Sequence, residues 1–280
     1  MSRGVAAAEP RTLAPPERRF APVLANEALG AYRLLRAHDA DGPPDPRPGQ
    51  FYMLAAGERW GGGPGERPYL PRAFSYARSR AAERGVVLEF LLEAVGPGTE
   101  RLAELAEGED LALVGPLGVG FRFPSADGRT RLLVGGGIGV APLVCLAEEL
   151  GPEADVLLGF RSGDHAAAAG LFGPAAVVTD DGSVGRRALV TELLRERLDA
   201  DPQALVYACG PPPMLEAVRA LCLERAAPAQ LALESGMACG FGACFGCVVP
   251  TREGYLRLCV DGPVLDAELL ETALFPGAGH

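Results

Sequence analysis

Four cysteines near the carboxyl end of the chain have a spacing that is typical of metal ligands. Cys239, Cys244, Cys247 and Cys259 follow the pattern C-x4-C-x2-C-x11-C. The loop that holds the first three is rich in glycine, which adopts positive φ at little cost and lets a short loop turn several thiolates inward. This spacing is associated with a [2Fe–2S] cluster. Zinc and a disulfide pair stay open as alternatives, although zinc sites usually combine C-x2-C pairs or use histidine.

Two glycine-rich loops further upstream could bind phosphate groups. Residues 135–142 read GGGIGVAP and residues 209–214 read CGPPPM, and each loop follows a predicted strand. Backbone N–H groups at a helix N-terminus attract phosphate oxygens, and ligands of open parallel sheets bind at the carboxyl edge of the strands. The first loop does not complete the G-x-G-x-x-G fingerprint, and tight packing is the alternative role for its glycines. The predicted nucleotide contacts are Gly135, Gly136, Gly137, Gly139, Gly210 and Pro211.

A predicted strand over residues 70–77 carries another candidate anion site. We expect Arg72 and Ser75 on one face of this strand, where a guanidinium and a hydroxyl suit a diphosphate. A surface arginine on an exposed strand is the alternative. Downstream, a GPGT sequence leads into a predicted helix over residues 99–106 with Thr99 as its N-cap, which is a second possible anion site.

Two patterns of predicted secondary structure position these residues. In the first half of the chain, short apolar segments separated by turn residues predict an antiparallel β-barrel or sandwich. In the second half, apolar strands alternate with helices, which predicts a parallel sheet with helices on both faces. The predicted strands cover 29–38, 50–54, 70–77, 86–95, 110–114, 132–134, 156–160, 175–179 and 204–209, and the later helices cover 139–150, 186–198 and 212–226.

These patterns divide the chain into four parts. We expect a disordered tail over residues 1–19, a β-barrel domain over 20–127, an α/β domain over 128–230 and a cluster domain over 231–280. The last unit is too small to fold without its cluster. Residues 57–68 are predicted to form a flexible insertion or a hairpin tip.

Composition excludes some classes of protein. The net charge of −10 over 280 residues argues against a nucleic-acid partner, because no basic surface would hold a phosphate backbone. No apolar run reaches the length of about 18 residues that a membrane-spanning helix needs, and no secretory signal is recognisable. Seven cysteines in such a chain favour metal ligation over disulfides and a cytoplasmic location.

Together, these motifs resemble a known group of proteins. An Arg-x-x-Ser strand, a Gly-Thr helix start, GPLG, GGGIGVAP and CGPPPM occur in that order, as in the ferredoxin-reductase-type flavoproteins. Those proteins join an FAD-binding antiparallel barrel to an NAD(P)-binding α/β domain. The segments TDDGSVG at 179–185, ESGMACGFGACFGCVV at 234–249 and LCVDGPV at 258–264 further resemble the electron-transfer subunit of NAD-dependent dihydroorotate dehydrogenase, over roughly residues 20–270.

The resemblance implies roles for particular residues. Ala73 and Val119 replace a proline and an asparagine that are usual in the family. Cys209 falls where related reductases place a cysteine near the nicotinamide, and we expect it to be a neighbour of the hydride site, not a nucleophile. Cys145 and Cys222 are expected to be small core residues. The implied flavin contacts are Arg72, Ala73, Phe74, Ser75, Leu91, Leu92, Glu93, Gly98 and Thr99, and the implied cluster ligands are Cys239, Cys244, Cys247 and Cys259.

The resemblance also implies an activity. NADH, FAD and the [2Fe–2S] cluster would exchange electrons with an FMN-containing catalytic subunit that oxidises dihydroorotate to orotate in pyrimidine biosynthesis, with NAD⁺ as acceptor. The complex would be a heterotetramer with two copies of each subunit. The NAD(P)H-oxidising subunit of a hydrogenase, a sulfite reductase or a ferredoxin:NADP⁺ transhydrogenase is one alternative. A zinc-stabilised binding module without redox activity is another.

Overall fold

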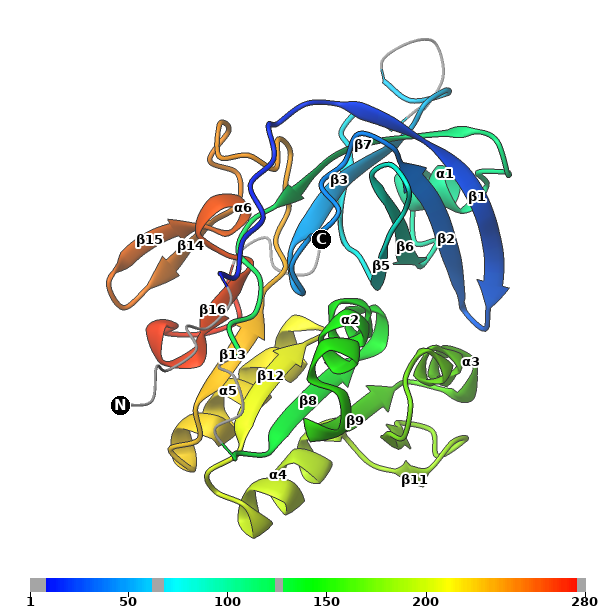
Figure 1. Ribbon diagram of the computed structural model, residues 1–280. Helices are drawn as coiled ribbons and strands as arrows, with labels where there is room; N and C mark the ends of the chain where they lie inside the picture. Colours follow the sequence, from blue (N-terminus) through cyan, green and yellow to red (C-terminus); the bar gives the residue numbers. More distant parts are fainter. Residues whose placement is uncertain (1–8, 62–67, 124–127, 276–280) are drawn as a thin grey trace.

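The computed structural model describes residues 9–61, 68–123 and 128–275. The first half of the chain forms a curved antiparallel sheet of seven strands in the order β4-β3-β7-β1-β2-β6-β5, which curls around a core that includes Leu35, Tyr52 and Phe90 (Figure 1). Helix α1 (Pro97–Ala103) packs against β3 and β6. The strands are β1 (Arg19–Leu29), β2 (Tyr32–Asp39), β3 (Phe51–Ala56), β4 (Arg72–Ser75), β5 (Arg78–Ala81), β6 (Val86–Leu92) and β7 (Asp110–Leu117).

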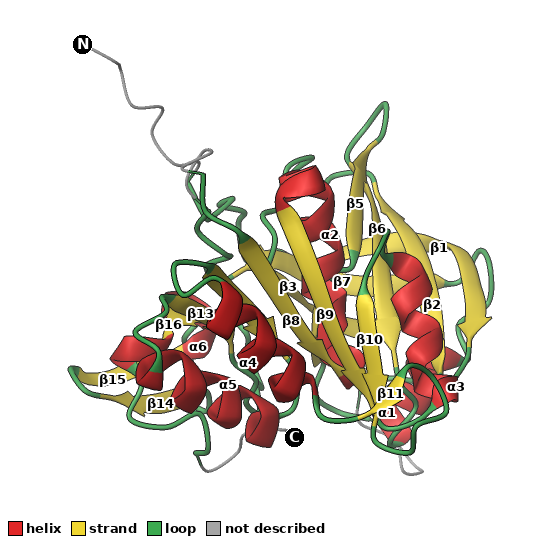
Figure 2. Cartoon of the chain, turned by 90° about the horizontal axis from the view of Figure 1, so that it is seen from below, coloured by secondary structure: helices red, strands yellow, loops and turns green. Residues whose placement is uncertain are grey.

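The second half contains a sheet whose first six strands, in the order β11-β10-β9-β8-β12-β13, are parallel. Helices α2 and α3 cover one face and α4 and α5 cover the other, as Figure 2 shows from below. The elements are β8 (Arg131–Gly136), η1 (Gly137–Val140), α2 (Ala141–Leu150), η2 (Gly151–Glu153), β9 (Ala154–Phe160), α3 (Gly163–Ala166), η3 (Ala167–Leu171), β10 (Ala176–Thr179), β11 (Arg186–Arg187), α4 (Val190–Ala200), β12 (Leu205–Cys209), α5 (Pro212–Glu224) and β13 (Ala229–Ala232).

The C-terminal segment leaves this sheet and then returns to it. After β13 the chain forms the cysteine loop, the hairpin of β14 (Val248–Thr251) and β15 (Gly254–Arg257), and helix α6 (Leu258–Asp261). Strand β16 (Val264–Asp266) then pairs antiparallel with β13, and η4 (Ala267–Leu269) follows. The division proposed between residues 230 and 231 therefore falls inside β13.

These features confirm the predicted fold class, a barrel-like antiparallel sheet followed by an α/β domain with a small C-terminal unit. In the barrel sheet, strands β1 and β5 were not predicted, and outside it strands β11, β13, β14, β15 and β16 were not predicted either, β11 lying at the start of the helix predicted over 186–198. The sequence of β5, RSRA, contains no large apolar residue, so it carries no alternating apolar pattern. Parts of the predicted tail, of the 57–68 insertion and of the boundary turn lie outside the described residues.

Part of the segment predicted as a disordered tail makes hydrogen bonds. The carbonyl of Pro10 accepts from the N–H of Gly120 (2.7 Å), and the side chain of Arg11 donates to the carbonyl of Val260. The N–H of Thr12 donates to Oε1 of Gln50 (3.2 Å). Residues 10–12 therefore lie between the barrel and α6.

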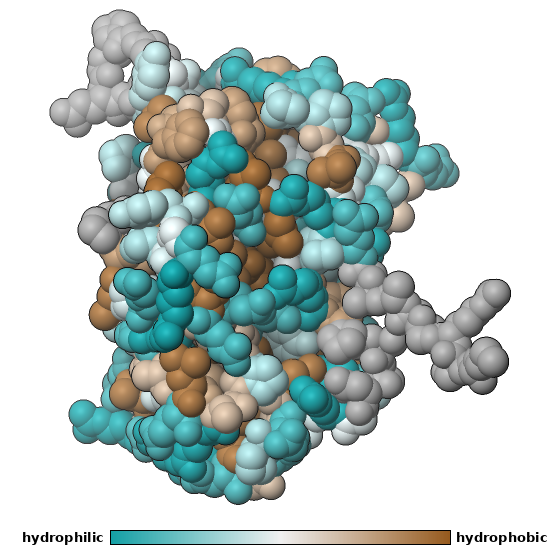
Figure 3. Space-filling view, turned by 90° about the vertical axis from the view of Figure 1, so that its left-hand side faces the viewer, coloured by the Kyte–Doolittle hydropathy of each residue, from teal (hydrophilic) through white to brown (hydrophobic). Residues whose placement is uncertain are grey.

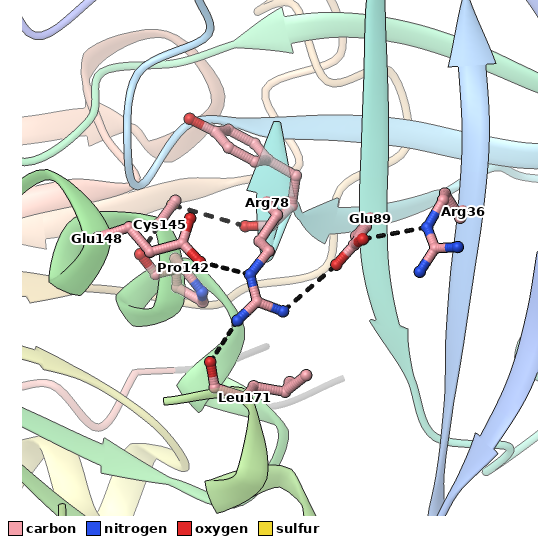
Figure 4. A network of polar contacts seen from close by, with 8 residues as sticks. Arg36, Arg78, Glu89, Pro142, Cys145, Glu148 and Leu171 are labelled. Carbon is pink, nitrogen blue, oxygen red and sulfur yellow. Dashed lines mark hydrogen bonds and ion pairs between the residues drawn. The ribbon is translucent and has the colours of Figure 1, made fainter. Parts of the chain in front are cut away.

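Helix α2 fills the space between the barrel and the parallel sheet. Its Cys145 is buried among barrel residues, 3.9 Å from the carbonyl oxygen of Tyr76. At the other end of the helix, Nε of Arg78 in β5 donates to Glu148 (2.5 Å), and Arg78 also contacts the carboxylate of Glu89 (3.5 Å) and the carbonyl of Leu171 (Figure 4). The two domains thus share apolar and charged contacts.

Candidate redox site

The four predicted cluster ligands lie close together in the C-terminal unit and form two pairs. Cys247 and Cys259 are buried, with their sulfur atoms 3.1 Å apart. Cys239 and Cys244 hydrogen-bond to each other, and the N–H of Gly246 donates to Sγ of Cys244 (3.4 Å). The fold therefore brings together thiols that the sequence separates by up to 20 positions.

The protein environment shifts the pKa values of two of these thiols, Cys239 and Cys259, in opposite directions. Burial opposes ionisation of Cys239, but N–H groups of Cys244, Phe241 and Ala243 outweigh it and lower the pKa of Cys239 to about 7. Burial raises the pKa of Cys259 to about 12, and the neighbouring Cys247 adds to the rise. The loop thus already stabilises one thiolate, which is the form that binds metals.

The arrangement of the thiols in two pairs matches the ligand pattern of a binuclear iron–sulfur centre. Each iron of a [2Fe–2S] cluster takes two thiolates, whereas a structural zinc ion takes four ligands. The cysteine pairs Cys239 with Cys244 and Cys247 with Cys259 fit the two-iron arrangement.

The cysteine loop packs on the barrel. Gly240 has φ +81°, and a Cβ at this position would lie 2.4 Å from Cγ of Met53 and 3.1 Å from Cδ1 of Leu117. Met53 in β3 is the register partner of Ala73 in β4, the strand predicted to contact the flavin. Only one strand therefore separates the predicted flavin strand from the cysteine loop.

The outer face of this unit exposes aromatic side chains. Phe241, Phe245 and Tyr255 are 48%, 63% and 78% exposed, which is unusual for residues of this size. Figure 3 shows the side of the molecule on which β14, β15 and α6 lie, with apolar patches between hydrophilic ones.

The two predicted nucleotide loops meet at the carboxyl edge of the parallel sheet. Gly135 in β8 pairs with Cys209 in β12, and a Cβ on Gly139 would lie 2.5 Å from Cα of Gly210. A Cβ on Gly136 would lie 2.4 Å from Sδ of Met214. Residues without a side chain are therefore needed at positions 136 and 139, so that the two glycine-rich loops can pack against each other.

Gly137 differs from the other glycines of these loops. It has φ +54°, and a Cβ at this position would meet no atom within 4 Å. Pro211, the exposed N-cap residue of α5, lies beside the neighbouring Gly136, where a Cβ would be 3.1 Å from Cδ of this proline. The open space at Gly137 is where a ligand could approach the backbone closely.

Cys209 ends β12 beside these loops and is half-buried. Burial, with a contribution from Glu234, raises the pKa of its thiol well above the ordinary value. The thiol is therefore protonated at neutral pH. The position of Cys209 beside the nicotinamide stays a prediction.

In the barrel, Arg72 lies at the first turn of α1. A Cβ on Gly98 would lie 2.7 Å from Cζ of Arg72, so the guanidinium rests directly on this glycine. Nη1 of Arg72 donates to the carbonyl of Leu70 (2.5 Å), and the guanidinium lies 5.8 Å from the ring centroid of Trp60. Among the described residues, Nε and Nη2 of Arg72 have no acceptor, which leaves them available to a diphosphate.

Two expectations for this region are wrong. The N-cap of α1 is Gly96, and Thr99 lies inside the first turn, where its hydroxyl oxygen accepts from the N–H groups of Val95 (2.9 Å) and Gly96 (3.1 Å). Arg72 and Ser75 also do not share a face, because β4 pairs with β3 without a bulge and side chains alternate with a period of two.

The face that each of these residues occupies follows from the register. Ser75 pairs with Phe51 and Ala73 with Met53, and the side chains of Phe51 and Met53 belong to the core that includes Cys247 and Cys259. Phe74 packs against the barrel core instead. Ser75 therefore lies toward the C-terminal unit and Arg72 toward the barrel side of the strand.

The other implied flavin contacts lie at the end of β6. Leu91 and Leu92 are buried on opposite faces of the sheet, Leu91 in the interdomain core and Leu92 in the barrel core. The carboxylate of Glu93 contacts Nη2 of Arg161 (2.9 Å) and Nε2 of His165 (3.4 Å). Its side chain thus links the barrel to the α/β domain.

Sequence reasoning missed the contact of Trp60 with Arg72 and the contacts of Arg257 in the cysteine loop. Nη1 of Arg257 donates to the carbonyl of Gly242 (3.1 Å). Trp60 is the only tryptophan of the chain, and its position in a glycine-rich segment was the one available signal.

Comparison with known proteins identifies the family. Residues 234–271 match the iron-sulfur cluster binding domain of dihydroorotate dehydrogenase B. The chain is 36% identical over 231 residues to the electron transfer subunit of dihydroorotate dehydrogenase B (NAD(+)) from Caldanaerobacter subterraneus, covering 80% of this chain and 86% of the relative. The subunit of the same name from a Geobacillus species is 40% identical over 210 residues, which is 71% of this chain and 79% of that one. The chain belongs to this family.

Solved structures show the same fold at lower sequence identity. A chain of the NADH-dependent reduced ferredoxin-NADP oxidoreductase superposes with a TM-score of 0.73 at 24% identity, covering 90% of both chains. The ferredoxin reductase of carbazole 1,9a-dioxygenase gives a TM-score of 0.61 at 23% identity, covering 75% of this chain and 65% of that one. Both confirm the ferredoxin-reductase-like architecture.

Family and fold together support the predicted cofactors of this oxidoreductase subunit, FAD, a [2Fe–2S] cluster and NAD(H). The assignment of individual contacts to these cofactors stays a prediction. Of the helices in the part of the chain that the structure describes, none has the length and apolar character needed to cross a membrane.

Proposed function

We propose that this chain carries electrons between NAD(H) and the flavin of a separate catalytic subunit that oxidises dihydroorotate to orotate, a step of pyrimidine biosynthesis. The observation that carries the proposal is the cysteine loop: four thiols in two pairs, inside a segment that matches the iron-sulfur domain of dihydroorotate dehydrogenase B. The relatives that match most of the chain are named electron transfer subunits of that enzyme.

In this proposal the barrel binds FAD across β4. Arg72 and the first turn of α1 hold the diphosphate, because the guanidinium lies on Gly98 and keeps donors free. Ser75, on the other face of β4, contacts the flavin end of the cofactor, on the side where Met53 meets the cysteine loop. Arg72 and Ser75 lie on opposite faces of β4. A ligand as long as FAD, which passes over the strand, could contact both residues.

The α/β domain holds the nicotinamide nucleotide at the carboxyl edge of its sheet. Gly137 lets the nucleotide approach the backbone, while Gly139 and Gly210 keep the two loops close together. Cys209 provides a neutral, half-buried wall beside the nicotinamide. When bound, FAD exchanges two electrons with the nicotinamide and single electrons with the iron–sulfur cluster.

The partner is an FMN-containing catalytic subunit, and we propose a heterotetramer with two copies of each chain. The chain's own acidic charge of −10 fits a protein partner and not a nucleic acid. The exposed aromatic side chains beside the cysteine loop provide apolar surface of the kind found at protein interfaces.

The test is purification of the protein under anaerobic conditions. We expect about one FAD, two irons and two acid-labile sulfides per chain. Both cofactors should absorb visible light. Mixed with its catalytic partner, the protein should support reduction of NAD⁺ by dihydroorotate. Stoichiometric zinc without acid-labile sulfide would refute the cluster and favour the zinc-stabilised binding module.

A further inference from the structure

Arg257 joins the two halves of the cysteine site. It is the last residue of β15, and its side chain donates from Nη1 to the carbonyl of Gly242 (3.1 Å) in the loop between Cys239 and Cys244. Its own N–H donates to Oδ2 of Asp261 (2.8 Å) at the end of α6, the helix that contains Cys259.

The same guanidinium covers an aromatic ring of the loop. Cζ of Arg257 lies 5.2 Å from the ring centroid of Phe245, the residue after Cys244. Phe245 has φ +59°, a strained backbone conformation that is uncommon for a residue other than glycine. A backbone conformation of this kind persists only where neighbouring contacts hold it, and Arg257 supplies one of them.

Gly242 is held in one orientation by these contacts. It has φ +86°, and a Cβ at this position would lie 2.6 Å from Cγ2 of Val260 and 3.2 Å from Nη1 of Arg257. While its carbonyl accepts from Arg257, its N–H hydrogen-bonds to the thiol of Cys259. Gly242 therefore connects the guanidinium to a predicted cluster ligand through two adjacent peptide groups, its carbonyl belonging to one and its N–H to the other.

The positive charge of Arg257 and the N–H group of Gly242 would both raise the reduction potential of a cluster bound here. Reduction adds one negative charge to the cluster, and a nearby cation or a hydrogen bond to a ligand sulfur stabilises that charge. We propose that Arg257 is a positioning residue that holds the Gly242 amide against Cys259 and thereby raises the reduction potential of the [2Fe–2S] cluster. This inference rests on the proposed function, because it requires the cluster to be present.

The experiment compares Arg257→Met and Arg257→Lys with the unmodified protein, each co-purified with the catalytic partner. An EPR-monitored potentiometric titration measures the reduced fraction of the cluster. At a fixed potential we expect the reduced-to-oxidised ratio of Arg257→Met to fall by on the order of tenfold, which is about 59 mV for one electron. The ratio for Arg257→Lys should lie between those of Arg257→Met and the unmodified protein. Lysine keeps the charge but not the planar contact with Gly242 and Phe245.

Arg252→Met is the matched control. Arg252 belongs to the same unit and is exposed, but its Nε donates away from the cysteines to the carbonyl of Leu270 (3.3 Å). Its removal should leave the titration unchanged, and the FAD potential should be the same in every variant.

Three results would overturn the inference. One is an unchanged cluster potential in Arg257→Met, and another is an equal shift in Arg252→Met, which would indicate a general effect of charge. If Arg257→Met does not retain iron, Arg257→Lys decides, and a potential equal to that of the unmodified protein counts against the inference. Absence of a cluster from the unmodified protein would instead refute the proposed function.

Discussion

At the scale of single residues, the absence of a side chain at position 98 decides where the candidate flavin arginine lies. The guanidinium of Arg72 occupies the space that a Cβ on Gly98 would take, and its Cζ lies 5.8 Å from the ring centroid of Trp60. An arginine on a short strand would otherwise point into solvent. Here it is placed at the first turn of α1 with donors available for an anion.

Replacement of Arg72 tests this arrangement. In Arg72→Ala, loss of a charge-assisted bond to a diphosphate should cost on the order of 1.5–3 kcal/mol and weaken FAD binding roughly ten- to a hundredfold. Titration of flavin-free protein with FAD, followed by the fluorescence of the single tryptophan Trp60, measures the affinity. Arg84→Ala is the control, since that arginine is 75% exposed and pairs with Asp41.

The variant Gly98→Ala tests whether the position of the Arg72 guanidinium matters as well as its charge. It keeps the cation but displaces it, so FAD affinity should fall in the same direction as in Arg72→Ala. Equal affinity of Gly98→Ala and the unmodified protein would show that the position of the guanidinium is unimportant.

The thiol of Cys239 also differs in pKa from the thiols of Cys145 and Cys222. The pKa of Cys239 is lowered to about 7, against burial, by N–H groups of the loop, whereas burial raises the pKa of Cys145 and of Cys222 to about 12. In iron-free protein, alkylation of Cys239 by iodoacetamide should rise with pH and reach half its maximum near pH 7. Mass spectrometry of labelled peptides checks this. Faster labelling of Cys145 or Cys222 than of Cys239 would contradict it.

At the scale of elements, helix α2 determines how the nucleotide loop faces the barrel. The loop that contains Gly137 runs directly into α2. Arg78 holds the far end of the same helix through Glu148, while Glu89 stays paired with Arg36 (3.1 Å) inside the barrel. Removal of Arg78 therefore loosens the helix without leaving Glu89 as a buried, unpaired carboxylate.

Arg78→Ala should slow the reduction of bound flavin by NADH, with FAD content unchanged. A loss of about 1 kcal/mol in positioning corresponds to roughly a fivefold slower rate. Anaerobic stopped-flow measurement of flavin bleaching gives this rate. Arg84→Ala again serves as the control, because its ion pair lies within the barrel sequence and is mostly exposed. A normal rate in Arg78→Ala would show that α2 is held by its apolar contacts alone.

At the scale of the whole molecule, the C-terminal unit is held by its neighbours as well as by its cysteines. Strand β16 pairs with β13 of the parallel sheet, and Gly240 packs on Met53 of the barrel. Thr272 and Ala273 donate to the carboxylate of Glu216 in α5, whose pKa is lowered to about 2 by its hydrogen bond with Arg219 and by these contacts. The unit therefore has anchors that do not depend on a cluster.

Cys247→Ser should lose or impair the cluster, since oxygen replaces a soft thiolate ligand. Hydrogen exchange should then increase in the β14–β15 hairpin, while β13 and β16 stay protected by their pairing. NADH should still reduce the flavin at a near-normal rate. Circular dichroism that matches the unmodified protein is the control for folding.

Transfer to the partner should fail in the same variant, because the cluster is the proposed route between the two flavins. Reduction of NAD⁺ by dihydroorotate in the reconstituted complex measures this transfer. If it persists without the cluster, the proposed electron path is wrong.

Local patterns in the sequence determined much of this protein. The spacing of Cys239, Cys244 and Cys247 within one short loop predicts three of the proposed cluster ligands, because a loop that wraps a small inorganic centre keeps these thiols close in sequence. The alternation of apolar strands with helices predicted the parallel sheet, and the glycine-rich turns at Gly137 and Gly210 predicted its binding edge. These features arise from interactions within a few residues, which leave a periodic signal.

Only the tertiary structure decided how these parts combine. The pairing of Cys247 with Cys259, the position of Arg72 on Gly98 and the return of β16 to the parallel sheet join residues that are distant in the chain. The register of β4 on β3 placed Arg72 and Ser75 on opposite faces, against expectation. Contacts of this kind depend on complementary packing between separate elements, which produces no periodic pattern along the sequence.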